Sequence, residues 1–111
     1  MRILVAYGDE HRVYREVIAS GIRLLRPENA VATCTQGELG SELERFDPQV
    51  VICDLPETAE PGDRLAWIEL PLETLRPTKV RIGGRHRECT HLLLEGLLEL
   101  IDEAHVLTSG K

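Results

Sequence analysis

The chain has 111 residues, of which 42% are hydrophobic and 29% are charged. This length suits one folded domain with a single core, which we expect over residues 1–107, with a disordered tail at residues 108–111. A net charge of −6 disfavours nucleic acid as a partner, because phosphate binding requires a basic surface. No apolar run approaches the roughly 20 residues of a membrane span, and the chain begins with a strand-like segment instead of a signal peptide, so we expect a cytoplasmic protein.

An apolar segment at residues 2–7 predicts a first strand, after which Gly8 permits a sharp turn. Between residues 10 and 26 apolar residues recur at helical spacing, which predicts an amphipathic helix that Pro27 ends. The positions that carry this spacing are Tyr14, Val17, Ile18, Gly21, Ile22 and Leu25. Asp9 and Glu10 lie at the start of the helix, where its dipole favours negative charge. Helix capping accounts well for one of these acids and less well for two.

Residues 30–34 predict a second strand, and the helix after it begins with a capping box of Thr35 and Glu38. The predicted inner face of this helix comprises Leu39, Leu43 and Phe46. An Asp-Pro turn then leads into an unbroken apolar run at residues 50–53, which is typical of a strand covered on both faces of a parallel sheet. The first half of the chain is therefore predicted to alternate strand, helix, strand, helix and strand.

Asp54 follows the third predicted strand, so its carboxylate lies at the carboxyl end of the sheet, where α/β proteins bind ligands. Right-handed crossovers place the first strand between the second and the third, in the order 2-1-3. Asp9 and Asp54 then come from adjacent strand ends, and with Glu10 they bring three carboxylates to one rim. Because Mg²⁺ prefers oxygen ligands, this rim is a candidate Mg²⁺ site, where a neutralising ion would allow Asp54 to attack a phosphoryl donor.

The second half of the chain follows a different pattern. Residues 55–64 contain two prolines and a glycine without helical spacing, and they predict a binding loop or lid beside Asp54. Residues 65–70 and 79–83 are strand-like, and the eight residues between them are too few for a parallel crossover. We therefore expect an antiparallel hairpin, followed by a final helix at residues 85–105.

Leucines cover more than one face of that final helix. The stripe expected to dock on the sheet comprises Leu93, Leu97, Leu100, Ile101 and Ala104. Leu94 and Leu98 lie outside this stripe and form a candidate homodimer face, although scattered apolar residues are also normal on surfaces.

Three cysteines, at positions 34, 53 and 89, are too few and too dispersed for a disulfide framework, so we expect buried, reduced thiols. His86, Cys89 and His91 are close in sequence but do not share a helix face well, which favours surface histidines over a transition-metal site. Trp67 is expected to pack in the core or in the hairpin, with the lining of a ligand groove as the alternative.

Two segments of the first half together resemble a known family. RILVAYGDEHRVYREVI followed by FDPQVVICDLPE is similar to the first half of a bacterial response-regulator receiver domain, over about residues 2–57. The resemblance implies an α/β, flavodoxin-like three-layer sandwich, here with parallel strands 2-1-3, a C-terminal β-hairpin and a final packing helix. It also implies that Asp9 and Glu10 bind Mg²⁺ and that Asp54 accepts a phosphoryl group from a histidine kinase.

The second half departs from that family. Receivers carry a Ser or Thr at the end of the fourth strand and a Lys-Pro at the end of the fifth, whereas these strands end here in Glu-Leu-Pro (69–71) and Gly-Gly (83–84). We therefore expect a degenerate receiver that binds a histidine kinase or another regulatory protein and has no enzymatic turnover beyond a phosphoacceptor role of Asp54. The alternative is a nucleotide-binding protein similar to universal-stress domains, in which residues 83–85 would open a helix and cradle phosphate.

Overall fold

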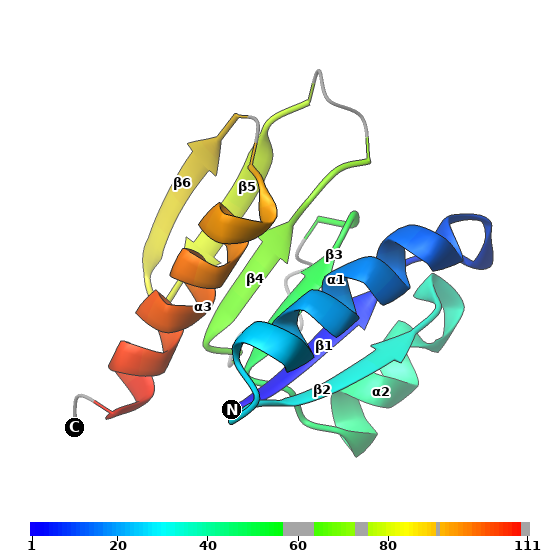
Figure 1. Ribbon diagram of the computed structural model, residues 1–111, viewed down its shortest axis with the longest axis horizontal. Helices are drawn as coiled ribbons and strands as arrows, with labels where there is room; N and C mark the ends of the chain where they lie inside the picture. The colour runs from blue at the N-terminus through cyan, green and yellow to red at the C-terminus, as the bar shows by residue number, and fades with distance from the viewer. Residues whose placement is uncertain (57–63, 73–75, 91, 110–111) are drawn as a thin grey trace.

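The structure is a computed structural model that describes residues 1–56, 64–72, 76–90 and 92–109. Within these residues, six strands form one mixed sheet in the order β2-β1-β3-β4-β5-β6 (Figure 1). The strands are β1 (Arg2–Ala6), β2 (Ala30–Cys34), β3 (Val50–Cys53), β4 (Ala66–Glu69), β5 (Thr78–Ile82) and β6 (Arg85–Cys89). β1 to β4 run parallel, whereas β5 is antiparallel to both β4 and β6. The predicted 2-1-3 order and the antiparallel hairpin are confirmed.

The half of the sheet made by β2, β1 and β3 is covered on both faces. Every residue of β3 is buried, which explains why its sequence is an unbroken apolar run. Helix α1 (Arg12–Leu25) packs Ile18 and Ile22 against one face, together with the odd-numbered apolar residues of β1. Helix α2 (Leu39–Arg45) packs Leu39 against the other face. The two helices therefore enclose this half of the sheet between them.

Both of these helices begin with a short 3₁₀ helix. Asp9–His11 precedes α1, and Gln36–Glu38 precedes α2. The predicted capping box is present: the N–H of Glu38 donates to the Thr35 hydroxyl, and the N–H of Thr35 donates to the Glu38 carboxylate at 3.0 Å. These bonds satisfy N–H groups that have no partner within a helix, so the chain turns into α2 where the sequence predicts.

The apolar stripe predicted for α1 is wider than the face that the core covers. Three of its positions are exposed: Tyr14, Val17 and Leu25. Arg15 instead takes a place on the buried face, beside Ile18 and Ile22. Helical spacing therefore identified the helix, but it did not identify which apolar residues the sheet would cover.

The half of the sheet made by β4, β5 and β6 has a different environment. In the hairpin, Glu69 pairs with Lys79 and Ala66 pairs with Ile82. Helix α3 (Leu94–Ser109) packs over this half on the face that also carries α1, and among the described residues no helix covers the other face (Figure 1). With α2 behind the first half, the described chain has three layers, and the third layer is incomplete.

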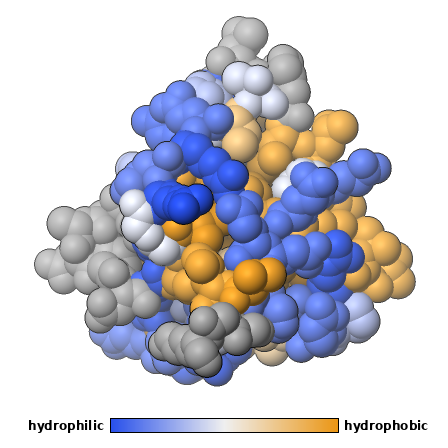
Figure 2. Space-filling model, turned by 90° about the vertical axis from the view of Figure 1, so that its left-hand side faces the viewer, coloured by the Kyte–Doolittle hydropathy of each residue, from blue (hydrophilic) through white to orange (hydrophobic). Residues whose placement is uncertain are grey.

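β6 is an edge strand with charged, exposed side chains. Each of its residues except Cys89 is exposed. Figure 2 looks onto this side of the molecule, where hydrophilic side chains cover most of the surface and apolar ones gather at the lower centre and on the right. Charged side chains on an edge strand disfavour pairing with strands of other chains.

The helix expected from residue 85 is wrong in its first part, because residues 85–89 form β6. Gly83 has a left-handed φ of 59°, which closes a two-residue Gly-Gly turn between β5 and β6. Helical structure begins only at Leu94 and continues through Ser109, two residues into the segment expected to be a tail. Residues 110–111 lie outside the described part of the chain.

Helix α3 docks through an apolar face that differs from the predicted one. Its buried residues are Leu97, Leu98, Leu100, Ile101 and Ala104. The prediction was wrong for Leu93, which precedes the helix and is exposed, and for Leu98, which belongs to the core. None of the helices in the described residues has the length and apolar content that a membrane span requires.

Two ion pairs connect α3 to its neighbours. Arg26, at the end of α1, makes two contacts of 2.7 Å with the Asp102 carboxylate. Arg87 of β6 lies 2.5 Å from Glu103. One pair therefore joins the two halves of the molecule, and the other holds the edge strand to its helix.

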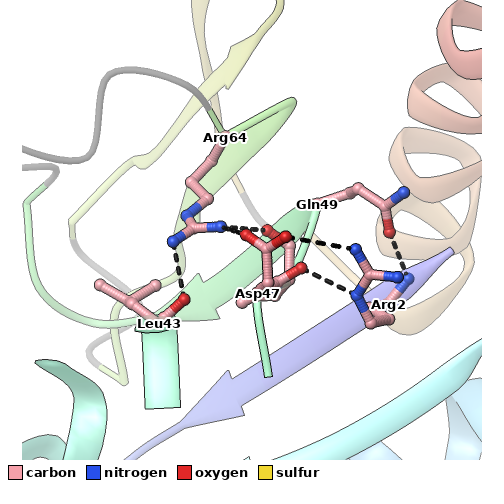
Figure 3. A network of polar contacts seen from close by, with 6 residues as sticks. Arg2, Leu43, Asp47, Gln49 and Arg64 are labelled. Atoms are coloured by element: carbon pink, nitrogen blue, oxygen red, sulfur yellow. Dashed lines mark hydrogen bonds and ion pairs between the residues drawn. The ribbon is translucent and has the colours of Figure 1, made fainter. Parts of the chain in front are cut away.

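A network of polar contacts lies at the end of the sheet where β1 and β3 begin (Figure 3). Asp47, whose φ of 51° is left-handed, pairs through its carboxylate with Arg64 and with Arg2 Nη2 at 3.5 Å. Arg64 also donates to the Leu43 carbonyl at 2.7 Å, and the Gln49 side chain accepts from the N–H of Arg2 at 2.6 Å. These contacts hold the predicted Asp-Pro turn and thereby the start of β3.

Candidate functional site

The carboxyl ends of β1 and β3 lie side by side, because Ala6 and Cys53 are paired at the ends of the two strands. Asp54 directly follows β3, and Asp9 follows β1 after a two-residue connection that includes Gly8. The predicted adjacency of these two strand ends is therefore confirmed. The start of the 3₁₀ helix before α2 completes this rim, because it supplies a side chain that contacts Asp54.

That side chain is Gln36, whose Nε2 donates a hydrogen bond to Asp54 Oδ1 at 2.5 Å. Gln36 also lies close to Gly8: a Cβ added there would be 3.8 Å from Gln36 Oε1 and 3.0 Å from Glu10 Oε1. Gly8 therefore leaves room for the Glu10 side chain, and Gln36 lies between this turn and Asp54. Sequence reasoning missed Gln36, although its place in the capping box put it beside the strand ends.

Asp9 is held by Arg15, which the sequence analysis did not single out. Arg15 Nη1 lies 3.6 Å from the exposed Asp9 carboxylate and donates to the carbonyls of Tyr7, at 2.9 Å, and Cys34, at 3.5 Å. The guanidinium is buried, so it binds the final carbonyls of β1 and β2 beneath the rim. The signal for this role was its position three residues before Ile18, on the buried face of α1.

The three predicted metal ligands share this rim, but each has a protein partner of its own. Asp9 pairs with Arg15, Asp54 accepts from Gln36, and the exposed Glu10 carboxylate lies 4.0 Å from His11 Nε2. Within the described residues, no group of three or more His, Cys, Asp or Glu side chains is arranged to hold a metal ion. Binding of Mg²⁺ at this rim stays a prediction, and it would require the exposed carboxylates to turn inward.

Two side chains hydrogen-bond the backbone directly after Asp54. The carbonyl of Leu55 accepts hydrogen bonds from Trp67 Nε1 at 3.0 Å and from Cys53 Sγ at 3.4 Å. Trp67 is buried, which confirms the expected packing role of this residue. The loop predicted at residues 55–64 begins from this anchored position, and residues 57–63 lie outside the described part.

The two cysteines of the first half of the chain are buried, and their pKa values are raised. Cys34 and Cys53 are buried and unpaired, and burial raises the pKa of Cys34 to about 11 and that of Cys53 to about 12. Cys89 is half-buried and lies on β6 with His86 rather than at a helix start. Residue 91, the third member of the weighed metal cluster, lies outside the described residues.

Tyr7 ties the rim to β4. Its side chain is buried and its hydroxyl donates to the Leu70 carbonyl at 2.9 Å. Burial raises the pKa of this hydroxyl well above its usual value. Tyr14 of α1 packs edge-on against the ring, with centroids 5.3 Å apart. The neutral phenol is therefore a structural donor beneath the candidate site.

The direction of β5 determines which residues can reach the rim. Lys79, at the start of β5, lies opposite Glu69 at the carboxyl end of β4. The strand then runs away from Asp54, and the N–H of Gly83 donates to the Leu65 carbonyl at 2.8 Å, before β4 begins. Residues 83–85 therefore form a hairpin turn at the opposite edge of the sheet. The expectation that they open a helix was wrong, and phosphate binding by this segment stays a prediction.

The uncovered face of β4, β5 and β6 carries a shallow hollow of about 540 Å³. Its lining includes Trp67 and charged side chains of both signs, among them Glu69, Lys79 and Glu88. A sheet face that borders water is normally polar, and mixed charges do not select one kind of ligand. This hollow is therefore best described as the solvent face of the antiparallel half.

The carboxyl rim remains the candidate site, since it combines acidic side chains with an amide and with hydrogen-bonded strand ends. Its carboxylates can accept hydrogen bonds or bind a cation, and Asp54 accepts one from Gln36 and directly precedes Leu55, whose carbonyl is hydrogen-bonded. In comparison with known proteins, no family model, no curated protein and no solved structure matches the chain.

Proposed function

We propose that the chain is a receiver-like regulatory module, flavodoxin-like in its first half, that acts by binding another protein and does not use Asp54 as a phosphoacceptor. The parallel 2-1-3 strand order and the acidic turn after β1 support the receiver-like part of this proposal. The partner class is a histidine kinase or another regulatory protein, as the resemblance of residues 2–57 implies.

One observation carries the degenerate part of the proposal, namely that β5 is antiparallel to β4. In a receiver, the fifth strand delivers a lysine at its end to the rim that holds the phosphoacceptor. Here the residues after β5 lie at the end of the sheet where β4 begins, because the N–H of Gly83 donates to the Leu65 carbonyl. The fourth strand ends without a hydroxyl residue. The groups that hold and report a phosphoryl group in receivers therefore have no equivalents at these strand ends.

The contacts of the acidic side chains support the same proposal. Asp54 already accepts a short hydrogen bond from a neutral amide, and Asp9 has a cationic partner in Arg15. A phosphoryl donor that reacts with Asp54 Oδ1 would have to displace Gln36 first, because that oxygen already accepts its hydrogen bond. A Mg²⁺ ion would likewise compete with Arg15 for Asp9. Both steps oppose phosphorylation relative to a rim with free carboxylates.

The test incubates the protein with acetyl phosphate and Mg²⁺ and measures its intact mass, with Asp54→Asn as the matched control. We expect no phosphoryl adduct on either protein and no rise in melting temperature with Mg²⁺ alone. An adduct on the wild type that Asp54→Asn abolishes would contradict the proposal of a degenerate receiver and establish Asp54 as a working phosphoacceptor. Stabilisation by ATP instead would favour nucleotide binding, because a ligand raises stability only when it binds the folded state.

A further inference from the structure

The outward face of α1 carries large apolar side chains that the protein does not cover. Val13 is 76% exposed, Val17 is 60% exposed and Leu24 is 78% exposed. With Ser20 between them, they recur at intervals of three and four residues and therefore follow one side of the helix. We call these four residues the α1 stripe.

The α1 stripe lies opposite the part of the helix that docks on the sheet. The buried residues of α1 are Arg15, Ile18, Ala19 and Ile22, which lie about half a turn from the stripe. A shallow hollow of about 410 Å³ lies along the stripe, lined by Arg12, Val13, Glu16, Val17 and Ser20. Single apolar residues on a surface are normal, but a contiguous apolar face marks an interaction site.

One flank of the stripe is apolar and extends it toward α3. Tyr14 and Leu25 are partly exposed on this side. Leu94 packs against Gly21, where an added Cβ would lie 3.0 Å from Leu94 Cδ2, so the start of α3 adjoins α1 without a gap. Leu93, which directly precedes Leu94 in the chain, is 73% exposed.

The other flank is charged, and its charges are ordered along the helix. Arg12 and Glu16 lie near the amino-terminal end and Arg23 near the carboxyl-terminal end, and all three are exposed. Glu16 lies 3.5 Å from Arg15 Nε, and Arg23 donates from Nη2 to the Val31 carbonyl at 3.0 Å. These contacts hold an acid and a base at separate positions on the same flank.

We propose that the α1 stripe binds a second copy of this chain, with the two α1 helices antiparallel about a two-fold axis. This arrangement opposes Val13 to Leu24 of the second copy and brings the two Val17 side chains near the axis. Because a two-fold contact uses the same patch on both copies, the charged flanks meet in reversed order. Glu16 then faces Arg23 of the second copy, twice per dimer.

Charge complementarity selects this occupant and this orientation. A parallel pair would place the charged flank of each copy against the apolar flank of the other, which leaves Glu16 and Arg23 without opposite charges across the contact. This dimer rests on the proposed role of the chain as an interaction module, of which a second copy would be one partner. It is independent of Asp54, so failure of the phosphorylation test and failure of dimerisation are separate results.

The first test measures the dissociation constant of the full chain by analytical ultracentrifugation over a range of concentrations. Val17→Glu and Leu24→Glu should each raise Kd by about tenfold or more, because each places two charges in an apolar interface. Val106→Glu is the matched control: Val106 is 65% exposed on α3 outside the stripe, and its Kd should not change. Circular dichroism checks that every variant is folded.

The second test reverses the charges. Glu16→Arg and Arg23→Glu should each weaken the dimer several-fold, and the double variant should return Kd to near the wild-type value, because it restores opposite charges. A chain that is monomeric at every concentration would overturn the proposal. So would a dimer that Val17→Glu leaves intact, or a double variant that is weaker than both single ones.

Discussion

The two halves of the sheet differ in how many of their faces helices cover, and their strands differ in apolar pattern accordingly. In the half made by β2, β1 and β3, helices lie on both faces and the central strands are continuous apolar runs. In the half made by β4, β5 and β6, α3 covers one face, and Val80 and Ile82 alternate with the polar residues Lys79 and Arg81. The apolar pattern of a strand therefore follows the number of its faces that are buried.

The largest expected effect comes from comparing a fully buried position of β3 with an exposed position of β5. Ile52→Ala in β3 should lower the free energy of unfolding by about 3 kcal/mol, because it leaves a cavity in a fully buried strand. Lys79→Ala on the open face of β5 should lower it by less than about 1 kcal/mol. Urea unfolding measures both, and equal losses would contradict the difference in covering between the halves.

An intermediate effect concerns the thiols, which are buried only in the first half. Cys34 and Cys53 have folded-state pKa values raised from 9.0 to about 11 and about 12, so they stabilise the fold below pH 9 and lose that contribution as the pH rises toward 12. Stability measured by urea unfolding should fall over this range.

The same thiols can be compared by chemical modification. At pH 8, Ellman's reagent should modify Cys89 in the folded protein, whereas Cys34 and Cys53 should react only on unfolding, because burial raises the pKa of their thiols. Cys89→Ser is the control and should remove the fast reaction. Fast modification of a second thiol would show that the first half opens more readily than its covering layers imply.

The smallest expected effect concerns the ion pair that joins the two halves. Hydrogen bonding to Arg26 lowers the pKa of Asp102, so the pair stabilises the fold above the ordinary value of 3.8 and loses this contribution as the pH falls below it. Arg26→Ala should therefore be slightly less stable than the wild type at pH 7, with the difference vanishing at acidic pH. Because the pair is exposed, added salt should also reduce the difference. A difference that persists at pH 2 would point to lost packing of the arginine stem instead.

The candidate site was predictable to the extent that it depends on strand ends. The apolar run before Asp54 and the glycine turn before Asp9 were enough to place both acids at neighbouring strand ends. The partners of these acids were not predictable, because Gln36 and Arg15 reach them only through the way in which the starts of α2 and α1 sit on the sheet.

The helical and strand spacing of apolar residues, and the residues that end each element, could be identified from the sequence alone. Apolar runs, the capping box and the short link between β4 and β5 specified the 2-1-3 core and the antiparallel hairpin, because these features depend on neighbouring residues. Three features depend on the packing of distant segments: residues 85–89 form an edge strand, Leu98 is buried, and the α1 stripe faces outward. Each of these depends on which distant segment covers a surface, and local spacing carries no information about that.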